Sequence, residues 1–377
     1  MLSVNIVGTY ESDNSFLMEL LKPKFSWKSL SDLLKLLLML LIGSIVGSGF
    51  AVVGMPLPFF IGGLLGTIGL SSAANSRSVI FTFPKFLRTG FVALVGVLIG
   101  ATISPESISS FPNLGLSMVA VLAYVCLAHT LGFFISLKFG GYHKIDAFYA
   151  SMPGGFVEAV EIGERSGGNL RILVLSHLLR VLLVVILVPI LFWLVSGETV
   201  GSSANFNFQK GDYDRSDLIF IFALGFLGLI LGRLFRLPAG HLLGPIIISV
   251  AFHGAGVLDT SSPIWLLYLA QLFIGVGLGT QFSGSPKFDY KRVIKTSVFA
   301  TTLMLCLSAL FAFSLDRFSD LSFSALFLSF APGGVSEMGL IALSLGISPV
   351  MVAAHHMLRI FFTVFIAGIV TRTGKID

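Results

Sequence analysis

The stretch PGGFVE at residues 153–158 returns as PGGVSE at residues 332–337, and HLLR at 177–180 returns as HMLR at 356–359, each 179 positions later. Proline removes a backbone donor and glycine admits a positive φ, so each Pro-Gly-Gly interrupts a helix. A chance match of two such blocks at a single spacing is improbable. The sequence therefore predicts a duplicated chain in which each half carries one interrupted segment.

The chain around these blocks is strongly apolar. Of its 377 residues, 55% are hydrophobic and 11% are charged, and its mean hydropathy is +0.94. A soluble domain carries about 25% charged residues. This composition excludes a soluble enzyme, a disordered chain and a DNA-binding domain, and it predicts an all-α polytopic membrane protein.

Ten apolar runs are long enough, or nearly so, to cross a hydrocarbon core of ~30 Å, which takes about 20 helical residues. They lie at about 31–53, 57–72, 86–104, 115–138, 170–196, 217–235, 239–256, 263–283, 294–315 and 349–371. Two less apolar runs, at about 145–164 and 321–345, contain the Pro-Gly-Gly sequences.

Lysine and arginine residues decide the expected topology. If both Pro-Gly-Gly runs enter and leave on one side, 19 of the 24 Lys and Arg are cytoplasmic and 3 are external; if these runs span, the split is 12 against 10. The positive-inside rule favours the first arrangement. We therefore expect two inverted repeats of five transmembrane helices, each with a re-entrant or broken Pro-Gly-Gly segment, in an inner (plasma) membrane.

This topology sets the expected boundaries, with both termini in the cytoplasm. They are a cytoplasmic N-terminal segment (1–30), a first membrane repeat (31–199), an external connection (200–216), a second membrane repeat (217–371) and a cytoplasmic tail (372–377). An odd number of spans turns the second repeat upside down, which is the architecture of many secondary transporters.

Twelve residues of the repeated blocks are candidate substrate- or ion-binding residues. They are Pro153, Gly154, Gly155, Glu158, His177, Arg180, Pro332, Gly333, Gly334, Glu337, His356 and Arg359. In lipid, the backbone groups freed at an interruption must face protein, water or a ligand. Ionisable side chains at membrane depth are costly and are functional candidates. The alternative is that these groups only hold the interrupted segments in place.

We expect Glu158 and Glu337 to pair with Arg180 and Arg359, within a repeat or crosswise. A neighbouring Arg disfavours protonation of Glu, so the Glu protonates only if substrate or a conformational change takes the Arg away. We expect a small anion to compete for the Arg and release the Glu. The His of each His-x-x-Arg motif shares the helix face of its Arg. That His either relays protons or bonds to a nearby carbonyl.

The sequence predicts no metal site and no cofactor. Of seven histidines only His355 and His356 are adjacent, and neighbouring helical residues point about 100° apart, so they do not form a chelating face. Small residues at Gly-x-x-x-Gly spacing predict close helix packing rather than ligand binding. These pairs are 43/47, 62/66, 96/100, 228/232 and 275/279.

The duplicated blocks resemble the AbrB duplication family of bacterial membrane proteins, over about residues 35–371 and most closely over 330–359. The resemblance implies a link to regulation of gene expression or, by another family label, ammonia oxidation. It also implies a relation to antiporter-like carriers with inverted repeats. The first block has EIGER at 161–165 where the second has LIALS at 340–344, so the two halves are expected to differ in role.

We therefore expect a carrier that moves or senses a small ionic solute or a proton, rather than an enzyme. A membrane-embedded protein acting indirectly on gene expression is the alternative, and a redox enzyme is a third. The expected partners are the lipid bilayer and the small ion, without direct contact to nucleic acid. Self-association of the chain is left open.

Overall fold

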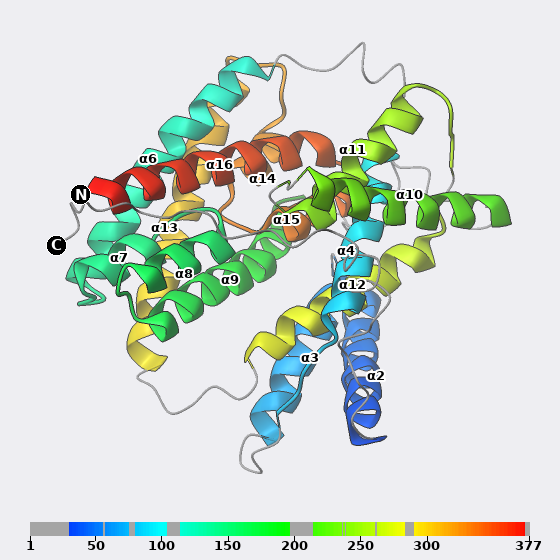
Figure 1. Ribbon diagram of the computed structural model, residues 1–377, viewed down its shortest axis with the longest axis horizontal. Coiled ribbons are helices and arrows are strands. Elements are labelled where there is room, and N and C mark those ends of the chain that lie inside the picture. Colours follow the sequence, from blue (N-terminus) through cyan, green and yellow to red (C-terminus); the bar gives the residue numbers. More distant parts are fainter. Residues whose placement is uncertain are drawn as a thin grey trace, which may run out of the picture.

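The computed structural model describes residues 30–55, 57–74, 80–103, 114–196, 214–235, 237, 239–260, 262–282 and 290–373. The regular structure in these ranges is entirely helical (Figure 1). The expected N-terminal segment, external connection and C-terminal tail lie almost entirely outside the described residues. The all-α prediction is confirmed for the part of the chain that the structure describes.

The helices follow the apolar runs of the sequence. They are α2 (Leu30–Val52), α3 (Pro58–Ala74), α4 (Lys85–Gly100), α6 (Gly115–Lys138), α7 (Lys144–Ala150), α8 (Phe156–Arg165), α9 (Leu170–Ser196), α10 (Arg215–Leu234), α11 (Gly240–Gly254), α12 (Ile264–Gly279), the 3-10 turn η2 (Thr280–Phe282), α13 (Tyr290–Asp316), α14 (Phe323–Phe330), α15 (Val335–Ser344) and α16 (Pro349–Thr373).

Seven of the described helices are long and apolar enough to cross a membrane. They are α2, α6, α9, α10, α12 with η2, α13 and α16. The other three expected runs form α3, α4 and α11, of 17, 16 and 15 residues. At 1.5 Å per residue these three are about 23–26 Å long, short of a ~30 Å core. The chain is a multi-pass membrane protein with seven candidate spans.

Apolar side chains on the outside of these spans indicate contact with the bilayer. Leu41 of α2 is 58% exposed, Phe222 of α10 is 59% exposed and Phe365 of α16 is 64% exposed. Side chains of this kind cost little next to acyl chains, which are as apolar as they are. The helix surfaces are therefore suited to lipid rather than to water.

One bundle consists of α2, α3, α4, α10, α11 and α12, and we call it the glycine-packed bundle. A Cβ atom at Gly62 of α3 would collide with the backbone of Gly47 of α2, and one at Gly244 of α11 would collide with the carbonyl of Gly228 of α10. Only glycine allows such an approach. The predicted packing role of the Gly-x-x-x-Gly pairs is confirmed at these two contacts.

The other bundle consists of α6–α9 and α13–α16, and we call it the Pro-Gly-Gly bundle. In Figure 1, α6–α9, α13 and α16 lie on the left, whereas α2, α3 and α12 lie at the lower right. The bundles meet where α4 contacts α15 and α16. Each Pro-Gly-Gly lies inside the second bundle and separates two short helices, α7 from α8 and α14 from α15. The predicted interruptions are therefore present.

Candidate functional site

The second Pro-Gly-Gly turn is held by Arg359, whose residue surface is only 1% exposed. Its Nη1 donates to the carbonyls of Ala331 at 2.5 Å and Phe330 at 3.4 Å, and its Nη2 donates to the carbonyl of Gly333 at 2.7 Å. The end of a helix leaves carbonyls without an intrahelical partner. Because little water reaches this depth, the guanidinium group of α16 satisfies the carbonyls that the interruption leaves exposed.

The first turn is held in the same way by Arg180 of α9, which is 6% exposed. Its Nη1 donates to the carbonyl of Met152 at 2.6 Å, directly after the end of α7. Met152 lies 179 positions before Ala331, the acceptor in the second turn. The two interruptions therefore share one hydrogen-bond arrangement.

His177 and His356 complete this arrangement as bonded, fully buried side chains. Each Nε2 lies 2.9 Å from a backbone carbonyl, and each Nδ1 lies 2.8 Å from the Nη2 of the following Arg. Since Arg only donates and a carbonyl only accepts, Nδ1 accepts and Nε2 carries the hydrogen. Of the two expected roles, the geometry shows the carbonyl-bonded one, with both rings neutral.

The expected pairing of Glu158 and Glu337 with these arginines is wrong. Glu337 instead forms an ion pair with Arg88 of α4, at 3.8 Å between Oε1 and Nη2, and its Oε2 accepts from the Ser336 hydroxyl at 2.8 Å. Within the described residues, Glu158 forms no ion pair within 4 Å and is half-buried. The buried guanidinium groups are already occupied by carbonyls, which lie closer than either carboxylate.

A cavity of about 630 Å³ lies between the two bundles and connects the two Pro-Gly-Gly turns. Eight of the twelve predicted site residues line it, namely Gly154, Gly155, Glu158, Arg180, Gly333, Gly334, Glu337 and Arg359. The other four (Pro153, Pro332, His177 and His356) are buried and are not among its lining residues. The structure thus brings residues from both halves to one site.

The glycine-packed bundle supplies three ionisable lining residues that the sequence had not singled out as site residues. They are Lys85 and Arg88 of α4 and His241 of α11. From the sequence, Lys85 and Arg88 count only as cytoplasmic charges and His241 has no assigned role. A cation at the start of an apolar run was the one signal available, and it does not say which helix it will face.

The lining of the cavity is electropositive. Four cationic side chains face two carboxylates, and the first turns of α8 and α15, where helix N–H groups have no intrahelical partner, border it. The Nε atoms of Arg180 and Arg359 are buried and have no hydrogen-bond partner. These features suit a small anion. Within the described residues, no group of three or more His, Cys, Asp or Glu side chains is placed to hold a metal ion.

Comparison with known proteins relates most of the chain to others. A family model described as "Transition state regulatory protein AbrB" matches residues 59–374. A protein of Escherichia coli (strain K12) named "Putative regulator AbrB" is 21% identical over 313 residues, covering 83% of this chain and 88% of that protein. "Uncharacterized protein YhjN" of Bacillus subtilis (strain 168) is 23% identical over 353 residues, covering 88% of this chain and 91% of that protein. Both the match to the family model and these relatives extend over most of the chain, so the chain belongs to the AbrB family.

Proposed function

We propose that this chain is a secondary carrier that moves a small anionic solute through the cavity between its two bundles, without changing the solute chemically. The observation that carries the proposal is the pair of buried arginines, Arg180 and Arg359, whose Nε groups are unpartnered and which both line this cavity. A buried N–H group without an acceptor costs free energy. A bound carboxylate or phosphate oxygen would supply the missing acceptor.

The proposed architecture is two inverted repeats, with the Pro-Gly-Gly segments re-entrant or broken and both termini cytoplasmic. Matching helix bounds support it: α4, α8 and α9 begin 179 positions before α12, α15 and α16. Exchanged packing supports it too, since α3 packs on α12 while α11 packs on α4. Inverted repeats with interrupted helices near their interface are typical of carriers that alternate access to one site.

The ion pair between Arg88 and Glu337 is the contact that solute binding would break to start the movement of the proposed carrier. Arg88 belongs to the glycine-packed bundle and Glu337 to the Pro-Gly-Gly bundle, so the pair joins the two bodies across the cavity. At 3.8 Å it is a long contact, and a solute anion competes with Glu337 for Arg88. A buried carboxylate that loses its cation is less costly when neutral, so Glu337 would then take up a proton.

In this scheme, anion and proton binding release the Pro-Gly-Gly bundle from α4. The helix contacts between the bundles lie mainly between α4 and α15 and between α4 and α16, so few contacts resist a rigid-body shift. A hinge or shear displacement of one packed body against another is a common way of closing around a ligand. The shift would carry the arginines and their anion from one side of the membrane to the other.

The test is flux measured with purified protein in proteoliposomes that contain a pH-sensitive dye. External chloride, phosphate, acetate and succinate are added one at a time. We expect one of these probes to drive proton movement that saturates with its concentration. Arg88→Gln, which removes a cation 35% exposed at its side chain, should abolish coupling, and Glu337→Gln should allow solute exchange without proton movement.

Glu161→Gln is the matched control, because Glu161 is an exposed carboxylate on α8 outside the cavity. It should transport as the unmodified protein does. Unchanged flux in both Arg88→Gln and Glu337→Gln, with both variants eluting as folded protein, contradicts the proposal.

A second candidate is a membrane-embedded regulatory protein that transports no solute itself. The name of the Escherichia coli relative, "Putative regulator AbrB", favours this candidate. In that case the same anions would raise the unfolding temperature of the purified protein, and none would drive flux. The two proposals share the cavity and differ only in this outcome.

A further inference from the structure

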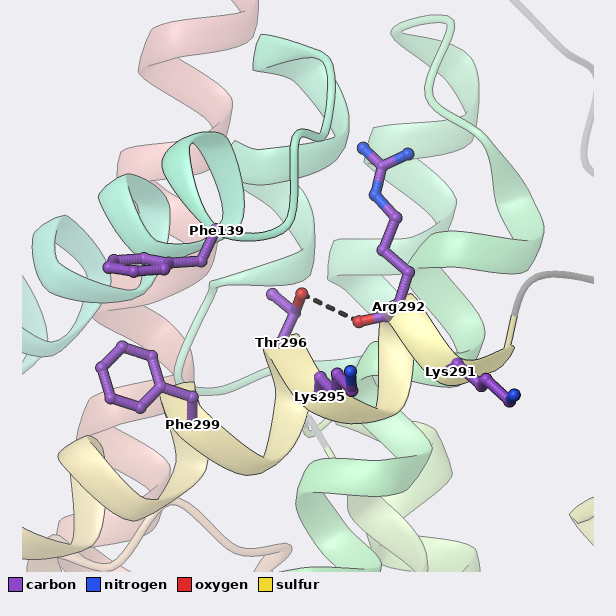
Figure 2. A pocket seen from close by; sticks show the side chains of 6 residues that line it. All are labelled: Phe139, Lys291, Arg292, Lys295, Thr296 and Phe299. Atoms are coloured by element: carbon purple, nitrogen blue, oxygen red, sulfur yellow. Dashed lines mark hydrogen bonds between the residues drawn. The ribbon is translucent and has the colours of Figure 1, made fainter.

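A second groove, of about 520 Å³, lies between the end of α6 and the start of α13 (Figure 2). It is lined by Phe139, Lys291, Arg292, Lys295, Thr296 and Phe299. None of these residues lines the cavity between the bundles. The groove therefore requires a separate explanation.

Arg292 builds the wall of this groove. Its Nε and Nη2 donate to the carbonyls of Gly140 and Gly141, and its guanidinium lies 5.7 Å from the centre of the Tyr142 ring. Gly141 has a φ of +53°, which glycine adopts without strain. These contacts fasten the turn after α6 to the first turn of α13, so the groove is formed before any ligand arrives.

Two exposed lysines line this preformed groove. Lys291 and Lys295 are four residues apart, so they lie on one face of α13. Both are exposed, and within the described residues neither forms an ion pair within 4 Å. Figure 2 shows Lys295 beside the Thr296 hydroxyl, which donates to the carbonyl of Arg292 at 2.9 Å. The cationic end of the groove is open to an anion.

The opposite end of the groove is aromatic. Phe299 lies one helical turn beyond Lys295 on the same face, and its ring centre lies 5.3 Å from that of Phe139 in an edge-to-face arrangement (Figure 2). Phe139 is 73% exposed and Phe299 is 48% exposed. Exposing two phenylalanine side chains to water costs free energy, whereas contact with acyl chains does not. This end of the groove suits hydrocarbon.

The groove also lies at the ends of two candidate membrane spans. The candidate span of α6 ends at Lys138 and that of α13 begins at Lys291, directly beside the groove. Basic side chains at the end of a span attract anionic lipid headgroups, and the stems of lysines reach along apolar surface to place their charge at the interface.

We propose that this groove binds one anionic phospholipid, with its phosphate headgroup at Lys291 and Lys295 and an acyl chain along Phe139 and Phe299. The order of the groups along α13 carries the assignment, because cations come first and the aromatic ring follows one turn deeper. A soluble anion would use only the cationic end. An amphiphile with a negatively charged head would use both ends. The site shares no lining residue with the carrier cavity and is independent of it.

The test is native mass spectrometry of the detergent-purified full chain titrated with phosphatidylglycerol, and separately with phosphatidylcholine. We expect one phosphatidylglycerol to bind in preference to phosphatidylcholine. The double variant Lys291→Gln/Lys295→Gln should bind phosphatidylglycerol about 25-fold more weakly, since each lysine near a charged surface contributes about fivefold. Phe299→Ala should also weaken binding while leaving the lysines in place.

The double variant Lys35→Gln/Arg233→Gln is the matched control, because it removes the same charge from the glycine-packed bundle, outside the groove. Its affinity should equal that of the unmodified chain. Equal loss in control and groove variants would show general surface attraction and overturn the site. Equal binding of phosphatidylcholine, or binding of glycerol 3-phosphate or inorganic phosphate as strong as that of the lipid, would overturn the assignment to a phospholipid.

Discussion

The two Pro-Gly-Gly turns share their hydrogen bonds and differ in their surroundings. In both, an arginine and a histidine from the following long helix bond to carbonyls at the interruption. After the turn, however, every residue from 337 to 344 of α15 is buried, whereas α8 ends in exposed Glu164 and Arg165. The helix that follows the turn is thus enclosed in the second half and partly exposed in the first.

This difference extends to the two carboxylates. Glu337 is 4% exposed and forms its ion pair with Arg88, whereas Glu158 is half-buried. The residue 179 positions after Arg88 is Leu267, a buried side chain of α12, so the first carboxylate meets no matching cation. The comparison teaches that the hydrogen bonds required by the interruption are kept in both halves, while the ionic contacts across the cavity are not.

The largest expected effect concerns the hydrogen bonds that the two turns share. Arg359→Ala leaves three carbonyls and a histidine without their donor and should lower the free energy of unfolding by about 3–5 kcal/mol. Arg180→Ala, which removes one carbonyl contact and one histidine contact, should cost about 1–2 kcal/mol less. Denaturant unfolding in detergent micelles measures both.

Arg317→Ala provides the reference, because Arg317 is exposed at the end of α13. It should change the free energy of unfolding by less than about 0.5 kcal/mol. A cost for Arg180→Ala equal to or above that for Arg359→Ala would contradict the hydrogen-bond explanation.

A smaller effect should separate α15 from α8. Leu340 of α15 is fully buried, so Leu340→Ala should destabilise the protein by about 2–4 kcal/mol through loss of packing. The matching residue of α8 is Glu161, whose ion pair with Arg165 is exposed, and Glu161→Ala should cost about 0.5 kcal/mol or less. Thermal unfolding of both variants checks the difference, and equal costs would mean that α8 is as enclosed as α15.

The smallest effect concerns the turns themselves. Gly155 has a φ of +65°, so Gly155→Ala should cost about 1–2 kcal/mol of backbone strain. Gly334 has a φ of −79°, and a methyl group there would meet only the flexible side chain of Glu337. Gly334→Ala should therefore cost less than about 1 kcal/mol in the same assay. A reversed order would show that the two turns do not differ in backbone strain as described.

Some predictions depended only on local chemistry, and these were confirmed. The combination Pro-Gly-Gly at 153–155 and 332–334 interrupts the helices because proline removes a backbone donor and two glycines in succession disfavour a helix. The close approach of Gly62 to Gly47 likewise needs only the absence of a side chain. Helix length was less well predicted for α4 and α11, since the apolar runs at 86–104 and 239–256 extend past the ends of these helices.

The partners of the charged residues were not predictable. Pairing the two glutamates with Arg180 and Arg359 was wrong because these arginines donate to backbone carbonyls, which every residue carries and no sequence pattern marks. Arg88 was missed as the partner of Glu337 because the two residues lie 249 positions apart and meet only where α4 touches α15.

By itself the sequence determined that this protein is helical, crosses a membrane many times and interrupts its chain at two matching points, because hydropathy and the backbone limits of proline and glycine act residue by residue. The tertiary structure alone decided that both interruptions border one electropositive cavity and that only one carboxylate finds a cation there. The reason is that electrostatic partners are chosen by distance in space, which depends on how the two bundles pack.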